Sequence, residues 1–221
     1  MNGETLKLLI RSLEETYKKD YLKWLRDIKS RGPFEILIST IISQNTSWRN
    51  TQEALKRLHK ITSLNPKVIA DTDVKVIEEA ISPAGLQKGK ARTIVDISRR
   101  IVEELNGDLH VLSHMSFKEA REWFLGTKGI GYKTADIVLA FSFNHNIVPV
   151  DTHIRRIAKR LKLTTSSDYE DIRREVEKYV PPKKRLFTHI ALIMFGRNVC
   201  KALNPRCNIC PIRELCPSRK S

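Results

Sequence analysis

The sequence has no long hydrophobic run, and this absence excludes one class of protein. A membrane-spanning helix needs about 20 consecutive apolar residues. The longest apolar stretches, such as ILISTII, are far shorter and have the length of a buried helix segment. The N-terminal stretch MNGETLKLLIRSLEE is acidic and amphipathic, unlike a signal peptide. We therefore expect an intracellular protein with neither a signal peptide nor a transmembrane segment.

Acidic residues are in the minority. The 221-residue chain has 40 Lys and Arg against 25 Asp and Glu, a formal net charge of +15. Such a charge favours a polyanionic partner, with nucleic acid as the first candidate, although solubility alone is an alternative explanation. The last 41 residues, from Pro181, carry nine Lys or Arg and one Glu. With 41% hydrophobic residues the chain is globular, and its length allows one large domain or two smaller ones.

Cysteine is scarce and confined to the C-terminal end. The chain has only Cys200, Cys207, Cys210 and Cys216, with the spacing C-x6-C-x2-C-x5-C. Disulfides are rare inside cells, so clustered cysteines there more often bind metal. Four thiolates can hold either zinc or a [4Fe–4S] cluster, and the spacing alone does not decide between the two.

No segment predicts a β-strand, and helical periodicity runs through most of the chain. Helices are predicted to start at Pro33, after a cap at Asn65, and after a cap at Ser116. A long amphipathic helix is expected over residues 90–105 and an apolar, buried one over residues 187–199. The sequence therefore predicts an all-α fold.

The segment KGIGYK, residues 128–133, joins two predicted helices through a tight turn. Gly129 and Gly131 suit this turn because glycine tolerates positive φ and lets another backbone come close. The free N–H groups and the dipole at the start of the second helix favour an anion such as a DNA phosphate. The pattern predicts a helix-hairpin-helix, which grips the DNA backbone without reading its sequence. An ordinary corner with glycines for packing is the alternative.

Two residues near this turn have the chemistry of a catalytic pair. Lys133 lies in the first turn of the second helix, where the helix dipole disfavours a cation and is expected to lower the lysine pKa. A neutral lysine can act as an amine nucleophile and form a Schiff base. Asp151 opens a later helix in the segment VDTH, and it is a candidate for an assisting carboxylate. As a helix cap, however, Asp151 needs no catalytic role.

Three motifs resemble the endonuclease III family of DNA glycosylases, within the helix-hairpin-helix, Gly/Pro-rich-loop, Asp superfamily. They are ISTIISQNTSW, GIGYKTADIVL and VDTHIRRIAKRL, and the resemblance extends to the last cysteine. It implies an all-α fold with a six-helix barrel domain and an iron–sulfur cluster domain, also helical. The expected barrel covers residues 27–144, with the hairpin at about 117–143. The second, discontinuous domain is expected over residues 1–26 and 145–221, with the cluster loop at 200–216.

The resemblance also implies an activity. The family contains bifunctional DNA glycosylases and AP lyases of base-excision repair, and oxidised pyrimidines in duplex DNA are the substrates expected here. Lys133 matches the lysine that attacks C1′ of a flipped-out nucleotide, and Asp151 matches the aspartate that assists it. The resulting Schiff base permits β-elimination on the 3′ side. A damaged base must leave the stack for such chemistry, and weak pairing makes extrusion easier.

Further residues match the family's DNA contacts. Gln44 matches the glutamine that fills the vacated space, and Leu86 in AGLQKGKA matches a side chain that wedges into the duplex; a core leucine is the alternative for Leu86. Lys88 and Lys90 are candidates for phosphate contacts, or are simply solvated. Trp48 fits a core or helix-packing role better than base stacking, although its place near Gln44 leaves an approach to DNA open.

The hairpin departs from the family pattern at two places. Thr127-Lys128 stands where the family usually has Leu-Pro, and Tyr132 stands where it often has arginine. Lys128 is a candidate phosphate contact, and Tyr132 is expected either to stack near the flipped base or to pack against a neighbour. The predicted DNA-binding residues are therefore Gln44, Leu86, Lys88, Lys128, Gly129, Gly131 and Tyr132.

The family carries the four-cysteine pattern as a [4Fe–4S] site, so the resemblance favours that cluster over zinc. The cluster is expected to hold Arg206 and Arg213 toward DNA and to take no part in the glycosylase chemistry. The expected partner is double-stranded DNA with damaged bases or abasic sites, bound by a monomer in the cytoplasm or at the nucleoid. Two other functions stay open. One is a mismatch- or purine-specific glycosylase, whose relatives generally lack this lysine, and the other is a non-catalytic DNA-binding module with a structural metal.

Overall fold

The computed structural model describes residues 2–219, which contain helices and no strand. The predicted all-α fold is thus confirmed. The chain divides into two compact units. We call Lys29–His145 the hairpin unit, and residues up to Ile28 together with Asn146 onward the thiol unit. No helix within residues 2–219 combines the length and the apolar character that crossing a membrane requires.

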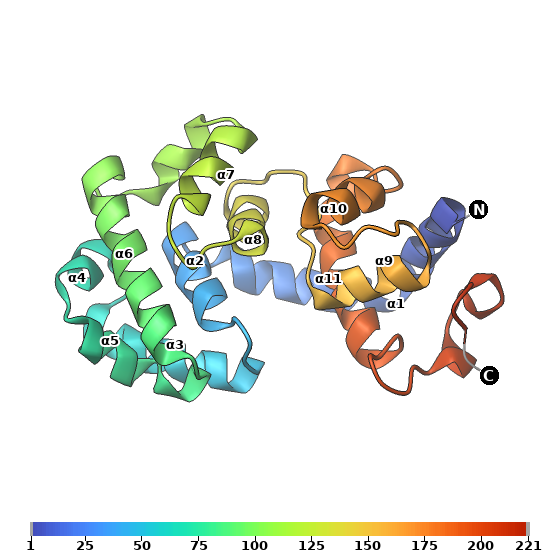
Figure 1. Cartoon of the computed structure of the whole chain (residues 1–221), viewed down its shortest axis with the longest axis horizontal. Helices are drawn as coiled ribbons and strands as arrows, with labels where there is room; N and C mark the ends of the chain where they lie inside the picture. The colour runs from blue at the N-terminus through green and yellow to red at the C-terminus, as the bar shows by residue number, and fades with distance from the viewer. Residues whose placement is uncertain (1, 220–221) are drawn as a thin grey trace. The chain divides into compact units, whose positions relative to one another are not determined.

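The hairpin unit is built around a helix that is buried on almost every side. Eight of the ten residues of α2 are buried, and α2 packs against α3, α6 and α8. Figure 1 shows the long helix α6 beside α4 and α5, which it also contacts. The elements are α2 (Pro33–Ile42), α3 (Trp48–Thr62), α4 (Pro66–Asp71), α5 (Val74–Ala80), η1 (Ser82–Ala84), α6 (Gln87–Leu105), η2 (Leu109–His114), α7 (Phe117–Leu125) and α8 (Tyr132–Ser142).

The helices of this unit start where capping chemistry predicts. Pro33 is the first residue of α2, and the side chain of Asn65 accepts a backbone N–H at the start of α4. Ser116 caps α7 in a reciprocal capping box, which satisfies two N–H groups that the helix leaves unpaired. The exception is α6, which begins at Gln87 rather than at Lys90, directly after Leu86 and without a side-chain cap that would mark its start in the sequence.

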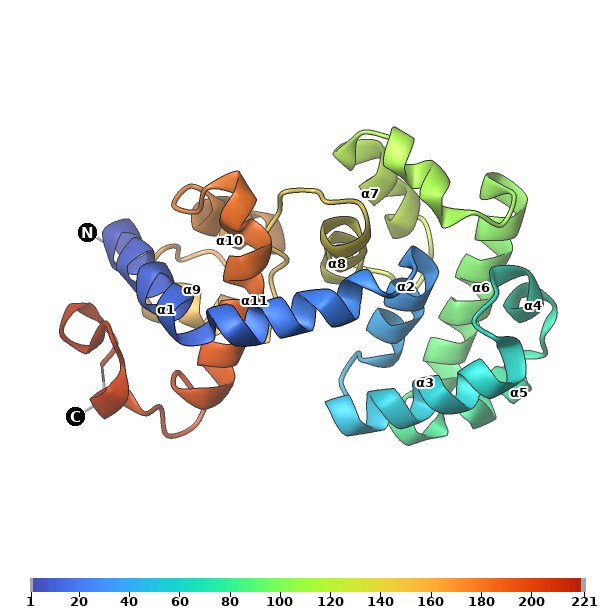
Figure 2. The same ribbon diagram turned by 180° about the vertical axis from the view of Figure 1, so that it is seen from behind.

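The thiol unit has its own apolar core. In Figure 2 the blue helix α1 passes in front of α11, and both contribute side chains to one core together with α9 and α10. Phe195 of α11 is buried there, as the apolar sequence of this helix predicts. The elements are α1 (Asn2–Lys29), α9 (Thr152–Arg160), α10 (Tyr169–Glu177), η3 (Pro182–Lys184), α11 (Arg185–Asn198), η4 (Cys207–Ile209) and η5 (Arg213–Leu215).

A buried ion pair joins the two helices that flank the hairpin. Arg121 Nη2 of α7 donates to Asp136 Oδ2 of α8 at 2.9 Å, and Arg121 Nε lies 2.8 Å from Asp136 Oδ1 as part of the ion pair. Asp136 is 0% exposed, and Arg121 is also buried. The guanidinium carbon of Arg121 lies 4.5 Å from the ring centroid of Tyr132. The pair therefore fixes α7 against α8 and places the ring of Tyr132 at the start of α8.

Replacing Asp136 with asparagine is expected to lower the free energy of unfolding by about 3 kcal/mol, because it leaves a buried guanidinium without its counter-charge. Urea unfolding followed by circular dichroism measures this change. Glu53→Gln is the matched control, since it breaks the exposed pair with Arg57 and should leave stability unchanged. Equal losses in both variants would contradict the structural role of the Arg121–Asp136 pair.

Candidate functional site

The hairpin between α7 and α8 depends on close contact with α6. Gly129 has φ +93°, and a Cβ atom there would lie 2.2 Å from Oγ1 of Thr93. The same Thr93 hydroxyl donates to the carbonyl of Lys128 at 3.1 Å. Gly131 differs, because its φ of −102° suits any residue and a Cβ there would meet no atom within 4 Å. Gly129 is thus required by packing and conformation, whereas Gly131 leaves open space at the start of α8.

Several of the predicted DNA-contacting residues lie around one groove in the hairpin unit. The groove has a volume of about 700 Å³ and runs along the start of α6. Arg92 adds a further positive charge to its lining. Gly131 and Tyr132 are not part of this lining. The predicted residues that line it are Gln44, Leu86, Lys88, Lys128 and Gly129.

Leu86 and Gln44 hold well-defined positions on the groove. Leu86 is 65% exposed, so the alternative of a core leucine is wrong. It follows Gly85. The φ angle is +65° at Gly85 and +52° at Leu86, and these two positive values turn the chain sharply before α6. Gln44 Nε2 donates to the carbonyl of Gly129 at 3.2 Å and to Oγ1 of Thr134 at 3.3 Å. Gln44 is therefore tied directly to the hairpin. The DNA roles of both residues stay predictions.

Two expectations for side chains near the groove are wrong. Lys90 is neither solvated nor within reach of phosphates, because it is buried and donates to carbonyls of Ile42 and Ala84. Trp48 does not pack between helices, because it is 59% exposed at the first position of α3, whose buried face begins only at Thr51. The Lys90 position had a signal in the sequence, since it lies on the apolar stripe of α6.

Lys133 is the second residue of α8, in the first turn that follows the hairpin, as predicted. Its side chain is half-buried. The N–H groups of Thr134 and Ala135 bond back to the carbonyl of Gly131, which closes the first turn around this lysine. The structure thus places an amine directly after the hairpin, and its catalytic role stays a prediction.

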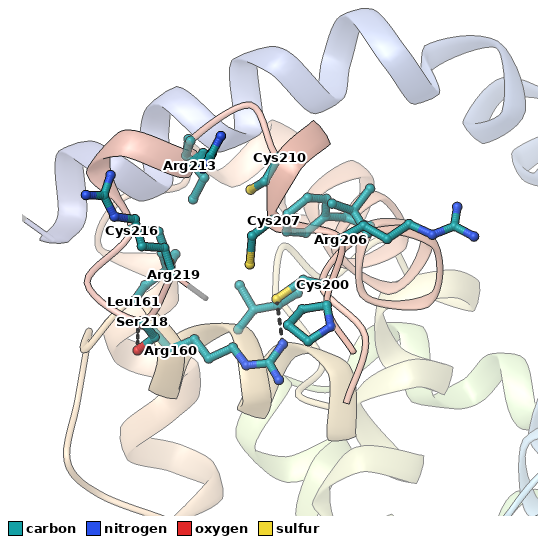
Figure 3. Close-up of a pocket in the computed structure, with 15 residues that line it drawn as sticks. Arg160, Leu161, Cys200, Arg206, Cys207, Cys210, Arg213, Cys216, Ser218 and Arg219 are labelled. Atoms are coloured by element: carbon teal, nitrogen blue, oxygen red, sulfur yellow. Dashed lines mark hydrogen bonds between the residues drawn. The ribbon is translucent and has the colours of Figure 1, made fainter. Parts of the chain in front are cut away.

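The four cysteines gather in the thiol unit. All are free thiols, and all four line one cavity together with apolar side chains of α9 and α11. In Figure 3 the sulfur atoms of Cys200, Cys207 and Cys210 point toward the same space. Burial raises the pKa of Cys210, and the other three thiols act in the same direction. Thiolates so close together need a cationic group to neutralise them.

The donor set of the thiols suits a metal centre. Within residues 2–219, no three His, Cys, Asp or Glu side chains form a set able to hold a single metal ion. All four cysteines nevertheless line one cavity, and four thiolates are the ligand set of either a zinc ion or a [4Fe–4S] cluster. The donor set of four thiolates and its apolar surroundings are both suited to such a cluster.

Two arginines of α9 anchor residues 200–216, which contain the four cysteines and which we call the thiol segment. Arg156 Nε donates to the carbonyl of Cys200 at 3.0 Å, and Arg160 Nη1 lies 3.1 Å from the Cys200 sulfur. Arg160 also donates to the carbonyls of Lys201 and Ala202, at 2.7 and 3.1 Å. The side chains of these two α9 arginines therefore hold the beginning of the thiol segment. These arginines belong to the motif VDTHIRRIAKRL, in which we singled out only the aspartate.

Asp151 is the N-cap of α9, and its Oδ1 accepts the N–H of Ile154 at 2.9 Å. The residues before it form an extended segment with no strand partner. Side chains of α10 replace the missing partners. The N–H of Val150 donates to the hydroxyl of Tyr169 at 3.2 Å. The carboxylate is thus held by its own cap and by a braced backbone.

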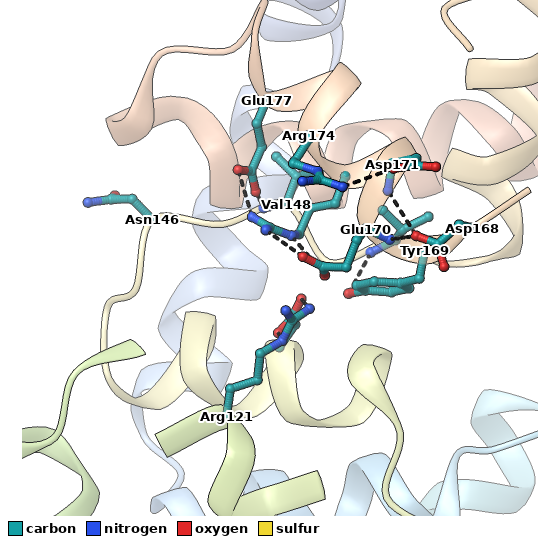
Figure 4. Close-up of polar contacts among 12 residues, drawn as sticks. Arg121, Asn146, Val148, Asp168, Tyr169, Glu170, Asp171, Arg174 and Glu177 are labelled. Atoms are coloured by element: carbon teal, nitrogen blue, oxygen red, sulfur yellow. Dashed lines mark hydrogen bonds and ion pairs between the residues drawn. The ribbon is translucent and has the colours of Figure 1, made fainter. Parts of the chain in front are cut away.

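The same extended segment is braced further by buried charged and polar groups. Glu177 Oε1 accepts the N–H of Val148 at 2.8 Å (Figure 4), and its Oε2 pairs with Arg173 at 2.9 Å. The ring Nδ1–H of His189 donates to the carbonyl of Pro149 at 2.7 Å. We did not predict that Glu177, Tyr169 and His189 would brace this segment. His189 had a signal, since it is the polar residue of the apolar run HIALIMF.

Comparison with known proteins agrees with the resemblance that the sequence motifs indicate. Residues 38–182 match the HhH-GPD superfamily of base excision DNA repair proteins, and residues 200–216 match the iron–sulfur binding domain of endonuclease III. The chain is 33% identical to Endonuclease III of Sulfolobus acidocaldarius, over 94% of this chain and 93% of that protein. It is 31% identical to Endonuclease III of Thermotoga maritima, over 92% of each chain.

A solved structure confirms the fold. The structure of a trapped endonuclease III–DNA covalent intermediate superposes with a TM-score of 0.83 at 24% identity, over 99% of this chain and 97% of that one. The chain therefore belongs to the HhH-GPD superfamily of base excision DNA repair proteins, as a DNA glycosylase of the endonuclease III type. Its C-terminal segment is an iron–sulfur binding domain. The predicted two-domain helix-hairpin-helix fold is confirmed.

Replacing Gly129 with serine is expected to lower the free energy of unfolding by about 2 kcal/mol, because the new Cβ collides with Thr93 at a positive φ. Gly131→Ser is the matched control. It adds the same side chain two residues away, in open space and at a helix cap that serine suits, so stability should not fall. Thermal or urea unfolding compares the two, and equal effects would contradict the hairpin geometry.

Proposed function

We propose that this enzyme is a bifunctional DNA glycosylase and AP lyase that removes damaged bases, chiefly oxidised pyrimidines, from duplex DNA. The observation that carries the proposal is the place of Lys133 in the first turn of α8, directly after the hairpin. A similar structure is described as a trapped endonuclease III–DNA covalent intermediate, which requires a nucleophile on the protein. A lysine amine is suited to form such a bond to a sugar carbon.

The reaction that we propose begins with the neutral amine of Lys133. Its nitrogen lone pair attacks C1′, the bond between C1′ and the base breaks, and the base leaves with that electron pair and gains a proton. The amine nitrogen loses a proton. Its lone pair then forms the C=N bond as the bond from C1′ to the ring oxygen O4′ breaks, and O4′ takes up a proton. The ring is now open, and Lys133 and C1′ are joined as a Schiff base. Loss of a proton from C2′ then breaks the bond from C3′ to its oxygen and cleaves the strand. Water releases the lysine.

Asp151 is proposed to stabilise the positive charge that develops on the sugar as the base leaves. Its Oδ1 is engaged in the cap of α9, which fixes the side chain and allows Oδ2 to face the substrate. A carboxylate held in advance lowers the barrier because it needs no reorganisation during the reaction. The braces from Tyr169, Glu177 and His189 support this role, since they limit movement of the backbone that carries Asp151.

The remaining predicted residues are proposed to bind DNA. Gln44 and Leu86 would occupy the space that an extruded nucleotide leaves, and their positions on one groove support this. Lys88, Lys128 and the hairpin residues Gly129, Gly131 and Tyr132 would contact the backbone nearby. We further propose that the enzyme acts as a monomer on double-stranded DNA, and that residues 27–144 form the six-helix barrel domain while residues 1–26 and 145–221 form the cluster domain.

We infer that the four cysteines hold a [4Fe–4S] cluster rather than zinc. A mononuclear zinc site draws four sulfur atoms to within about 2.3 Å of one point. The match of residues 200–216 to the iron–sulfur binding domain of endonuclease III supports the cluster instead. When bound, the cluster would tie Cys200 to the later cysteines and keep Arg206 and Arg213 in fixed positions. It supplies no step of the glycosylase reaction.

Borohydride reduction is expected to trap a covalent complex between the enzyme and a duplex that contains thymine glycol, because it reduces the Schiff base of Lys133. Lys133→Gln should lose trapping and slow strand cleavage by at least about a thousandfold, since it removes the nucleophile. Gel electrophoresis measures both. Lys118→Gln, an exposed lysine of α7, is the matched control and should keep full activity.

A panel of lesions tests the substrate class separately from the lysine chemistry. Faster excision of thymine or uracil opposite guanine, or of 8-oxoguanine, would replace oxidised pyrimidines as the proposed substrate. Tight DNA binding with no cleavage of any substrate would instead indicate a non-catalytic DNA-binding module.

The purified protein is expected to contain about four iron atoms and about four acid-labile sulfides per chain, as a [4Fe–4S] cluster requires. Metal analysis and absorption spectroscopy measure this content, and Cys207→Ser should lower it. A colourless protein with one zinc ion per chain and no iron would contradict the assignment. That result would leave the proposal for Lys133 standing, because the cluster takes no part in the chemistry.

A further inference from the structure

A buried ammonium group lies between the two loops that carry Gln44 and Leu86. The Nζ of Lys90 donates to the carbonyl of Ile42, the last residue of α2, at 2.9 Å. It also donates to the carbonyl of Ala84, the last residue of η1, at 3.0 Å. In each loop the bound carbonyl lies two residues before the predicted DNA-contacting residue. Lys90 is only 4% exposed, so it has almost no contact with solvent.

This ammonium has an electrostatic reason to occupy a buried position. Burial lowers the pKa of Lys90, which shows that the charge is held at a cost. Both of its partners are carbonyl oxygens rather than carboxylates. The last carbonyls of a helix have no intrahelical donor, and the C-terminal end of a helix dipole attracts a cation. Lys90 therefore supplies the missing donors to two helix ends at once.

We propose that Lys90 is a positioning residue for entry of Gln44 and Leu86 into the duplex. It fixes the position of these two residues relative to each other, which we call their register. The proposal rests on the proposed function, in which these two residues replace an extruded nucleotide. Neither loop can move relative to the other without breaking a hydrogen bond to Nζ. Gln44 is held a second time by its bonds to Gly129 and Thr134, which links the register of the loops to the hairpin.

A comparison of duplex and single-stranded DNA substrates distinguishes this positioning role from a general role in folding. Extruding a nucleotide from a paired duplex costs stacking and pairing energy, which residues that fill the vacated space offset. An abasic site in single-stranded DNA requires no such extrusion. Loss of register between Gln44 and Leu86 should therefore slow the reaction on duplex DNA and spare cleavage of the single strand. A damaged fold would slow both.

The test replaces Lys90 with methionine, which has a similar shape but no donor. Single-turnover rates are measured on a duplex with thymine glycol and on a single strand with an abasic site. We expect the duplex rate to fall about 10- to 100-fold, as misplacement of a positioned group would cause, and the single-strand rate to change less than about twofold. Lys75→Met, on the exposed face of α5, is the matched control and should change neither rate.

A second readout follows extrusion itself. Fluorescence of 2-aminopurine placed opposite the lesion should rise on binding of the wild-type enzyme and less on binding of Lys90→Met. In a Gln44→Ala, Leu86→Ala background, Lys90→Met should cause no further loss of the duplex rate. If Lys90→Met fails to fold, Lys90→Gln, which keeps a donor on a shorter arm, should show the same duplex-specific loss.

Equal losses on the two substrates, or no loss on either, would overturn the positioning role. A further loss of duplex rate in the doubly substituted background would overturn it as well. Failure of the proposed function looks different, because the wild-type enzyme would then cleave neither substrate.

Discussion

The contact between Gly129 and Thr93 is the constraint on which the hairpin unit depends. Because a side chain at position 129 would overlap the threonine hydroxyl, α6 and the hairpin can approach closely only with glycine there. That approach brings Thr93 Oγ1 to the carbonyl of Lys128 and fixes the point at which α8 begins. Lys133 follows in the first turn. A packing requirement between two helices thus determines where the amine stands.

The thiol unit reaches the same precision by different means. Asp151 ends an extended segment that lacks regular backbone partners, and such a segment would ordinarily be mobile. Buried side chains from α10 and α11 supply the partners instead, through Tyr169, Glu177 and His189. The helix that Asp151 caps continues to Arg156 and Arg160, whose side chains hold the start of the thiol segment. Asp151 and the thiol segment are therefore connected through α9 within one unit.

Much of this organisation could be predicted from the sequence because it depends on local signals. The caps at Asn65 and Ser116 and the turn at Gly129 follow from residues close together in the chain. In the same way, the four clustered cysteines predict a metal centre, and the lysine after the hairpin predicts a nucleophile. The predictions that failed concern contacts between residues far apart in the chain. The sequence leaves Lys90 as a phosphate contact or a solvated side chain, yet its partners Ile42 and Ala84 belong to other elements.

The supporting residues of Asp151 were missed for the same physical reason. Glu177 and His189 are ordinary in their own segments, and only the tertiary structure brings them to Val148 and Pro149. In the sequence, such long-range contacts are visible only as a polar residue on an otherwise apolar helix face. Lys90 on the stripe of α6 and His189 in α11 both show this pattern, which makes it a useful guide when no structure is available.

The central claim is that Lys133 forms the covalent bond to the sugar. The most direct measurement is peptide mass spectrometry of the wild-type enzyme after borohydride reduction on a short duplex that contains a lesion. The account predicts that the reduced sugar adduct maps to Lys133. An adduct on another lysine or on the N-terminal amine would contradict the account.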